Sequence, residues 1–208
     1  MTDYNYKLDK FLIPRIKNKM NPIIIEFGVQ NGRSTKKFLE ICEKNNGYLY
    51  SFDIIDCSQV SNSEKWTFAK SRDDNFEYLK TIIPKKVDLI FLDTVHEANH
   101  VEKMIYYYYD YLTEGGYFII DDISHLPYLK NQKRNNFYCE INNSETLKKI
   151  LEIYNSNTEN FDLTISFISS GLASLEKKNK NKLNKSNKII TREYSFKNIL
   201  RKIIKEQK

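Results

Sequence analysis

The chain has 208 residues, of which 40% are hydrophobic and 29% charged, so it can bury the core of one domain and is not expected to be disordered. Its first residues lack the apolar core of a signal peptide, and no apolar run approaches the ~18 residues that span a bilayer. The three cysteines form no CxxC pair, which excludes a zinc site of that kind, and we expect a reduced, cytoplasmic protein.

Charge divides the chain into an acidic body and a basic tail. Residues 1–176 carry 21 basic and 25 acidic side chains, a net charge of −4, whereas residues 177–208 carry 12 and 2, a net charge of +10. The overall net charge of +6 therefore comes from the tail. A nucleic-acid-binding surface on the body is not indicated.

Strands and helices are predicted to alternate along the body. Residues 1–20 form an N-terminal helical segment, a lid or a dimer contact, that turns four apolar side chains inward: Leu8, Phe11, Leu12 and Ile16. The predicted strands are residues 23–27, 48–53, 66–70, 87–93, 117–121, 161–168 and 172–176. The predicted helices are one capped by Ser34, one from Asp74 to Lys80, one running through Val101 to Leu112 and ended by Gly115-Gly116, and one capped by Ser144.

This alternation predicts an α/β sandwich with a mostly parallel sheet and one antiparallel strand in the final hairpin. Runs such as Ile23-Ile24-Ile25 are apolar without a break, as expected of strands that are covered on both faces. In such sheets ligands bind beyond the carboxyl ends of the strands. Carboxylates follow most of these ends, where burial is costly unless they bind something, so this edge is the predicted site.

The first strand leads into a glycine turn, Glu26-Phe27-Gly28-Val29-Gln30-Asn31-Gly32. Gln30 stands where the dinucleotide fingerprint has its second glycine, and no Gly-Lys-Ser/Thr of a phosphate loop follows. The turn admits a close ligand without demanding a diphosphate, although glycines after a strand are also commonly structural. Asp53 ends the next strand, where a carboxylate can accept two hydrogen bonds from a ribose diol. Together, the turn and Asp53 predict a nucleoside ligand.

Four motifs follow one another in order: ExGxxxG from Glu26, the acidic strand end at Asp53, Leu-Asp-Thr-Val-His from Leu92, and Glu-Gly-Gly-Tyr-Phe-Ile-Ile-Asp-Asp-Ile from Glu114. Over roughly residues 20–177 they resemble a class I S-adenosylmethionine-dependent methyltransferase, of the small bacterial macrocin O-methyltransferase and cephalosporin-hydroxylase-like group. The resemblance implies a Rossmann-like three-layer sandwich with a seven-stranded sheet in the order 3-2-1-4-5-7-6. We expect a methyltransferase domain at residues 21–177, followed by a basic linker and an amphipathic helix at 178–208.

The resemblance also implies which residues bind the cofactor, S-adenosylmethionine. Glu26, Gly28 and Gly32 would surround its methionine part, and Asp53 would hold the ribose. The edge of the adenine would lie against Ser71, Arg72 and Asp73, although Asp73 or Asp74 could instead cap the helix that follows.

Several relatives that methylate hydroxyls bind a divalent cation, and the resemblance assigns Asp93, Asp121 and Asp122 to it. Such an ion, Mg²⁺ by preference for oxygen ligands, lowers the pKa of an acceptor hydroxyl and positions it. Neighbouring strand residues point to opposite faces, so Asp121 and Asp122 reach one ion only if the strand ends there. In the alternative reading, Asp93 holds the amino group of the cofactor, Asp122 caps a turn, and no metal binds.

The base that removes the acceptor proton is predicted to be a histidine. His96 is the first choice and His125 the second, because each follows a strand end and a histidine accepts protons near neutral pH. In some relatives a carboxylate two residues after the first aspartate serves as base, but Val95 stands there in this chain. His100 is expected to be structural or exposed.

The expected reaction is O-methylation of a saccharide or small polar metabolite, because the polar loop 125–143 suits a hydroxyl-rich acceptor, although an ordinary solvated loop has similar composition. One alternative is a nucleic-acid methyltransferase, but the Asn/Asp-Pro-Pro-aromatic motif common in enzymes that methylate base amines is missing after the fourth strand. The other is a cofactor-binding scaffold without turnover.

The basic tail is predicted to be a low-complexity linker followed by a helix with an apolar stripe of Phe196, Ile199, Leu200, Ile203 and Ile204. We expect this helix to pack on its own domain or on a second subunit. An anionic membrane or a partner enzyme is the alternative.

Overall fold

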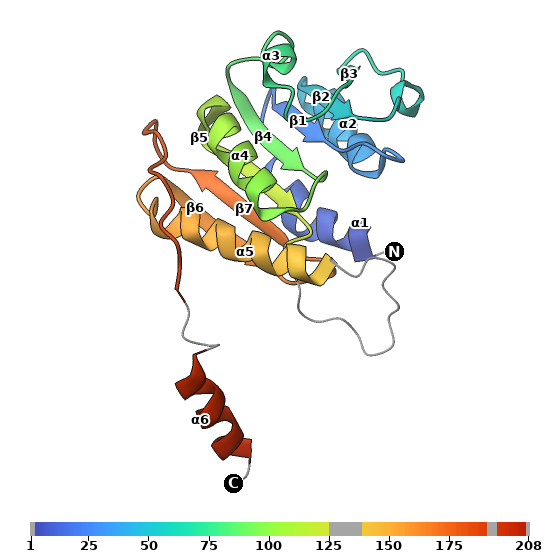
Figure 1. Ribbon diagram of the computed structural model, residues 1–208. Helices are drawn as coiled ribbons and strands as arrows, with labels where there is room; N and C mark the ends of the chain where they lie inside the picture. The colour runs from blue at the N-terminus through green and yellow to red at the C-terminus, as the bar shows by residue number, and fades with distance from the viewer. Residues whose placement is uncertain (1–2, 125–138, 191–194, 207–208) are drawn as a thin grey trace.

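The computed structural model describes residues 3–124, 139–190 and 195–206, and these form one seven-stranded sheet with helices on both faces (Figure 1). The strand order is β3-β2-β1-β4-β5-β7-β6. All neighbours pair in parallel except β7, which is antiparallel to β5 and β6. This confirms the predicted fold class, including the order of the strands. The strands are β1 Ile23–Phe27, β2 Tyr48–Asp53, β3 Trp66–Lys70, β4 Val87–Leu92, β5 Leu112–Asp121, β6 Phe161–Ser166 and β7 Leu172–Lys177.

Two apolar layers hold the helices to the sheet. One contains side chains of α4 and α5 and the other contains side chains of the N-terminal segment and α2. Successive strand residues alternate between the layers, so Ile24 joins one and Ile25 the other. The helices are α1 Asp3–Lys7, α2 Arg33–Asn45, α3 Phe76–Leu79, α4 Ala98–Tyr108, α5 Cys139–Asn155 and α6 Phe196–Glu206. Shorter turns cover Leu8–Leu12, Ile13–Arg15, Ser58–Val60 and Tyr109–Tyr111.

Three predicted helix boundaries are wrong. The N-cap of α2 is Gly32, in the left-handed region with φ 70°, and not Ser34, whose hydroxyl donates to Glu26 instead. Helix α4 ends at Tyr108, and Leu112 belongs to β5. The two glycines after it lie inside β5, where the pairing with β4 shifts register, so they form an irregularity in a strand and do not end a helix. Helix α5 already begins at Cys139, five residues before Ser144.

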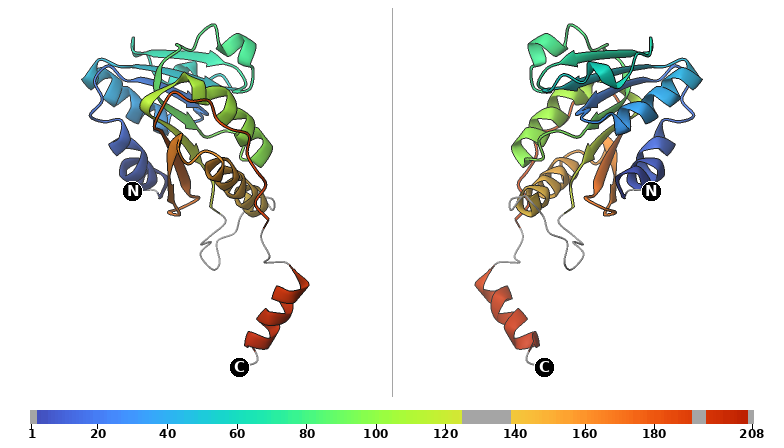
Figure 2. Two further views of the ribbon diagram at one scale, coloured as in Figure 1. Left: turned by 90° about the vertical axis from the view of Figure 1, so that its left-hand side faces the viewer. Right: turned by 90° about the vertical axis from the view of Figure 1, so that its right-hand side faces the viewer.

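The N-terminal segment packs against the sheet beside α2 (Figures 1 and 2). As predicted, Leu8, Leu12 and Ile16 are buried, and Phe11 is partly buried. The same helical face also buries Lys7, whose side chain is fully inaccessible to solvent. A buried lysine is costly unless it is paired, so its position needs an electrostatic explanation.

The first part of the tail, residues 178–190, is more ordered than a low-complexity linker, and we call it the C-terminal strap. It lies along α4 and α5 (Figure 2). Asn184 donates its amide N–H to Asn157 Oδ1 at 2.6 Å, and its carbonyl accepts from Tyr106 Oη at 2.8 Å. Leu183 packs against the core. Asparagines that look like linker composition thus act as hydrogen-bonding partners for the helices.

Helix α6 lies apart from the sheet (Figure 1), and the expectation that it packs on its own domain is not met. All five residues of its apolar stripe are exposed, Phe196 by 78%. Within the described ranges, no helix is long and apolar enough to cross a membrane.

Candidate active site

A cavity of about 650 Å³ lies at the carboxyl ends of the parallel strands, where the sequence predicts the site. Nine predicted site residues line it: Gly28, Asp53, Ser71, Arg72, Asp73, Asp93, His96, Asp121 and Asp122. Glu26 and Gly32 are not among the lining residues. His125, the second predicted base, and most of the loop 125–143 lie outside the described residues.

The glycines of the turn are required by close contacts. Gly28 has φ +94°, and a Cβ there would lie 2.0 Å from the carbonyl oxygen of Asp93. The chain leaving β1 therefore passes against the end of β4, which brings the turn and Asp93 to the same wall of the cavity. At Gly32, also at positive φ, a Cβ would meet Val60 at 2.2 Å.

Glu26 lies beneath the turn and is fully buried. Its carboxylate accepts hydrogen bonds from three hydroxyls, those of Ser34 at 2.5 Å, Thr35 at 2.8 Å and Ser51 at 2.7 Å. Burial raises the pKa of Glu26 to about 7, although the three hydroxyl donors lower it. Glu26 thus ties the first turn of α2 to β1 and β2, and in this arrangement it supports the turn from below.

Asp53 joins the end of β2 to the glycine turn. Its Oδ2 accepts the amides of Val29 at 2.8 Å and Gln30 at 3.0 Å, and its Oδ1 accepts the amide of Ile55 at 2.9 Å. Burial raises the pKa of Asp53, but these amides outweigh burial and the net pKa is below its ordinary value. Asp53 is therefore held as a carboxylate facing the cavity.

The predicted adenine edge is held by contacts that the sequence does not reveal. Asp73 is 6% exposed, and its Oδ2 accepts from the hydroxyl of Thr94 and lies 2.7 Å from His100 Nε2. His100 is thus structural, one of the two expected outcomes. Neither Asp73 nor Asp74 caps α3, whose N-cap is Asn75. Asp74 instead pairs with Arg72 at 2.9 Å.

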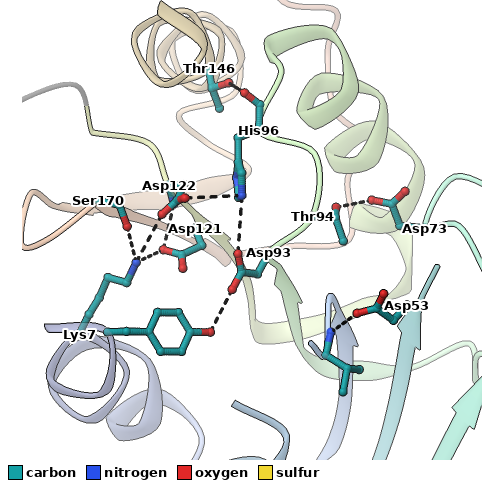
Figure 3. Close-up of polar contacts among 12 residues, drawn as sticks. Lys7, Asp53, Asp73, Asp93, Thr94, His96, Asp121, Asp122, Thr146 and Ser170 are labelled. Atoms are coloured by element: carbon teal, nitrogen blue, oxygen red, sulfur yellow. Dashed lines mark hydrogen bonds and ion pairs between the residues drawn. The ribbon is translucent and has the colours of Figure 1, made fainter. Parts of the chain in front are cut away.

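Three carboxylates converge where β4 and β5 end, as Figure 3 shows. Strand β5 ends at Asp121, and Asp122 takes the left-handed conformation, with φ 54°. This change of direction brings both carboxylates to the same side, which regular pleating would prevent. Asp93 reaches the same place from the end of β4.

Two side chains of α1 enter this carboxylate cluster. Lys7 Nζ forms an ion pair with Asp121 Oδ1, donates to Ser170 Oγ at 2.9 Å and lies 3.8 Å from Asp122 Oδ1. The hydroxyl of Tyr4 donates to Asp93 Oδ2 at 2.9 Å. Burial and the neighbouring carboxylates raise the pKa values of Asp93 and Asp121, whereas Lys7 lowers both.

The expected divalent cation does not fit the cluster in this arrangement. Its three predicted ligands, Asp93, Asp121 and Asp122, do come together, but the ammonium of Lys7 stands against two of them. A Mg²⁺ ion needs oxygen ligands at about 2.0–2.1 Å, in a position that a second cation cannot share. In the described part of the chain, no group of three or more acidic, histidine or cysteine side chains is arranged to hold a metal.

His96 lies between two of the three aspartates (Figure 3). Its Nε2 is 3.6 Å from Asp93 Oδ1 and 3.6 Å from Asp122 Oδ2, and the side chain is 26% exposed. The carbonyl of His96 accepts a hydrogen bond from Thr146 Oγ1 at 3.4 Å, which links this loop to α5. Two carboxylate oxygens therefore face the imidazole Nε2 inside the cavity.

Sequence reasoning missed Tyr4, Lys7, Thr94 and Ser170. Lys7 alone gives a signal, because it is a basic residue on the helical face that buries Leu8 and Leu12. Ser170 lies in the β6–β7 turn, 163 residues from Lys7, and nothing local in the sequence connects the two. Only the folded arrangement of the strands brings residues so far apart in the sequence into contact.

Comparisons with known proteins agree with this geometry. Residues 25–123 match a protein family described as a methyltransferase domain. A search of curated protein sequences gave no match. Among solved structures, the chain is similar in fold to the methyltransferase MycE of the mycinamycin biosynthetic pathway, in a structure described as a complex with Mg and SAH. The TM-score is 0.62 and the identity 16%, over 87% of this chain and 56% of that one, so the chain spans little more than half of MycE.

Two further structures match over most of their length. A protein of Staphylococcus aureus described as a caffeoyl-CoA O-methyltransferase has a TM-score of 0.62 and 17% identity, over 85% of this chain and 84% of that one. A protein of Clostridium thermocellum described as an rRNA methylase has a TM-score of 0.61 and 14% identity, over 87% and 98%. At these identities the likeness shows the fold. The sheet order and the cavity at its carboxyl edge are those of the class I methyltransferase fold, and the match to a methyltransferase domain covers residues 25–123 of this chain.

Proposed function

We propose that this protein is an S-adenosylmethionine-dependent methyltransferase that transfers the methyl group to a hydroxyl of a saccharide or another small polar metabolite. One observation carries the proposal: a single cavity joins the glycine turn and Asp53 to the pair of His96 with Asp122. A volume of about 650 Å³ is within the range of small-molecule sites. Cofactor and acceptor can therefore share one space, with a base at its acceptor end.

Asp53, Gly28 and the residues after β3 form the cofactor end in this proposal. Asp53 lines the cavity as a carboxylate fixed by backbone amides, so its oxygens can accept a ribose hydroxyl from the cavity side. Ile54 and Ile55 line the cavity next to it and are more than 60% exposed, which offers an apolar surface to the adenine. Asp73, fixed by Thr94 and His100, faces the same region.

His96 is the proposed base. The acceptor oxygen attacks the methyl carbon of the sulfonium, the carbon–sulfur bond breaks with its electron pair staying on sulfur, and the hydroxyl proton passes to His96 Nε2. The products are the methyl ether and S-adenosylhomocysteine. Asp93 and Asp122, each 3.6 Å from Nε2, stabilise the imidazolium.

The comparisons support a small acceptor without identifying it. One MycE structure is described as a complex with Mg, SAH and mycinamycin VI. The fold is equally similar to a protein described as an rRNA methylase, but the net charge of −4 on residues 1–176 disfavours a polyanionic acceptor here.

The test is mass spectrometry of saccharide and small polar acceptors incubated with the protein and isotope-labelled cofactor, together with calorimetry of S-adenosylhomocysteine binding. His96→Ala is expected to lower kcat by about 10²–10⁴-fold while the cofactor still binds, because general-base loss acts on the chemical step. A wild-type protein that binds no cofactor would refute the proposal. Unchanged kcat in His96→Ala would move the base to another group.

A further inference from the structure

The ammonium of Lys7 is a built part of the carboxylate cluster. The Lys7 side chain is fully buried, and its Nζ contacts the Asp121 carboxylate and the Ser170 hydroxyl and faces the Asp122 carboxylate at 3.8 Å. The ring of Tyr4, one turn earlier on the same segment, lies 5.3 Å from Nζ. Two N–H donors of the ammonium thus have hydrogen-bond acceptors, and the Asp122 carboxylate adds an ion pair.

The cluster needs one cation. Asp121 is 1% exposed and two further carboxylates lie beside it, so without a positive charge a buried carboxylate would face two like charges. Lys7 sits on a helical face that otherwise buries leucine and isoleucine, where an unpaired ammonium would be equally costly. Each group is therefore tolerated because of the other.

The third predicted metal ligand, Asp93, also contacts the segment that carries Lys7. Asp93 Oδ2 accepts the Tyr4 hydroxyl, and Asp121 Oδ1 receives both Lys7 and the amide of Asp122 at 2.9 Å. Every one of the three aspartates thus faces a donor of α1. A divalent ion bound by all three aspartates, Asp121 included, could enter only by displacing Lys7.

We propose that Lys7 is the resident cation of this site, a positioning residue that holds Asp121 and Asp122 in place, and that the protein binds no divalent metal there. The part of this inference that concerns turnover rests on the proposed function; the part that concerns metal binding does not. Removal of the ammonium should turn the three carboxylates into a cation site.

The experiment titrates Mn²⁺ into the full-length protein and follows free Mn²⁺ by electron paramagnetic resonance. Lys7→Met keeps an unbranched apolar stem and removes the charge. It is expected to bind one Mn²⁺ per chain at least about tenfold more tightly than the wild type, because its three carboxylates then lack a counter-charge. The matched control is Lys37→Met, which removes a lysine that pairs with Asp9 on the surface at 2.6 Å and should bind Mn²⁺ as the wild type does.

A second arm uses the wild type alone, so the proposal stays testable if Lys7→Met does not fold. The wild type should show no stoichiometric Mn²⁺ site, and its methyl transfer should be unchanged in EDTA. Stoichiometric Mn²⁺ binding by the wild type that Asp122→Asn abolishes would overturn the proposal, as would loss of transfer in EDTA with cofactor binding intact. Absence of transfer under all conditions would count against the proposed function, and the Mn²⁺ titration would still decide the role of Lys7.

Discussion

Glu26→Gln is expected to remove a pH dependence from the stability of the protein. Burial raises the pKa of Glu26 from 4.5 to about 7 in the folded chain, with the hydroxyls of Ser34, Ser51 and Thr35 acting in the opposite direction. Since the folded state holds this proton more tightly, its contribution to the free energy of unfolding is complete below about pH 4.5 and is lost as the pH rises through 7. At about 1.4 kcal/mol per pH unit, the shift is worth about 3 kcal/mol.

The measurement is urea unfolding of the wild type and Glu26→Gln at pH 5 and pH 8, followed by the fluorescence of Trp66. This residue, the only tryptophan in the sequence, donates to Ser51 Oγ at 2.9 Å, and Ser51 in turn donates to Glu26, so the probe lies in the same network. Between these two pH values the free energy of unfolding of the wild type should fall by roughly 2–3 kcal/mol more than that of the variant.

The control is Glu40→Gln, which changes an exposed carboxylate on α2, the helix whose first turn contacts Glu26, and should keep the wild-type pH dependence. Other buried carboxylates also titrate in this range, but their contributions are common to both proteins and cancel in the difference. Parallel pH dependences for the wild type and Glu26→Gln would show that the carboxylate under the turn stays ionised, and the reasoning from burial would be refuted.

Two further predictions concern the cofactor and the tail. Asp53→Ala should weaken cofactor binding by about 1.5–3 kcal/mol in calorimetry, the scale of hydrogen bonds to a charged group; equal binding by the variant would exclude Asp53 from the cofactor site. Truncation after Ile190 should leave the melting temperature and cofactor affinity unchanged, whereas truncation after Lys177 removes the Asn184 and Leu183 contacts and should lower the melting temperature. Identical melting temperatures for the two truncations would show that the C-terminal strap adds nothing to stability.

The sequence predicted the sheet well, for a physical reason. Strands such as Ile23–Phe27 and Val87–Leu92 are buried on both faces, and a continuous apolar run between turn residues has few other ways to fold. The glycine turn was equally readable, since Gly28 and Gly32 both adopt positive φ where a Cβ would clash. At these positions the local preference of the residues and the fold require the same conformation.

The ends of helices were predicted less well, because the residues there suit two different local structures. Ser34 is a good N-cap by composition, but its hydroxyl gains more from the buried carboxylate of Glu26 than from the helix backbone. The pair Gly115-Gly116 ends a helix in many sequences, yet here it accommodates a register shift within β5. In each case a tertiary partner decided between the alternatives.

The role of Lys7 depends on topology, and its one local signal, a basic residue on an apolar helical face, does not indicate which groups it contacts. Asp121 is 114 residues away, and Ser170 reaches the same ammonium only because β7 runs antiparallel beside β5. A lysine on an apolar helical face could have been read as a solvated residue, since lysines commonly extend to water. What distinguishes Lys7 is the absence of any route to solvent, together with three carboxylates that the sequence had already placed at one edge. The two observations explain each other. At the predicted metal site, the positive charge beside the aspartates comes from Lys7 of the chain itself.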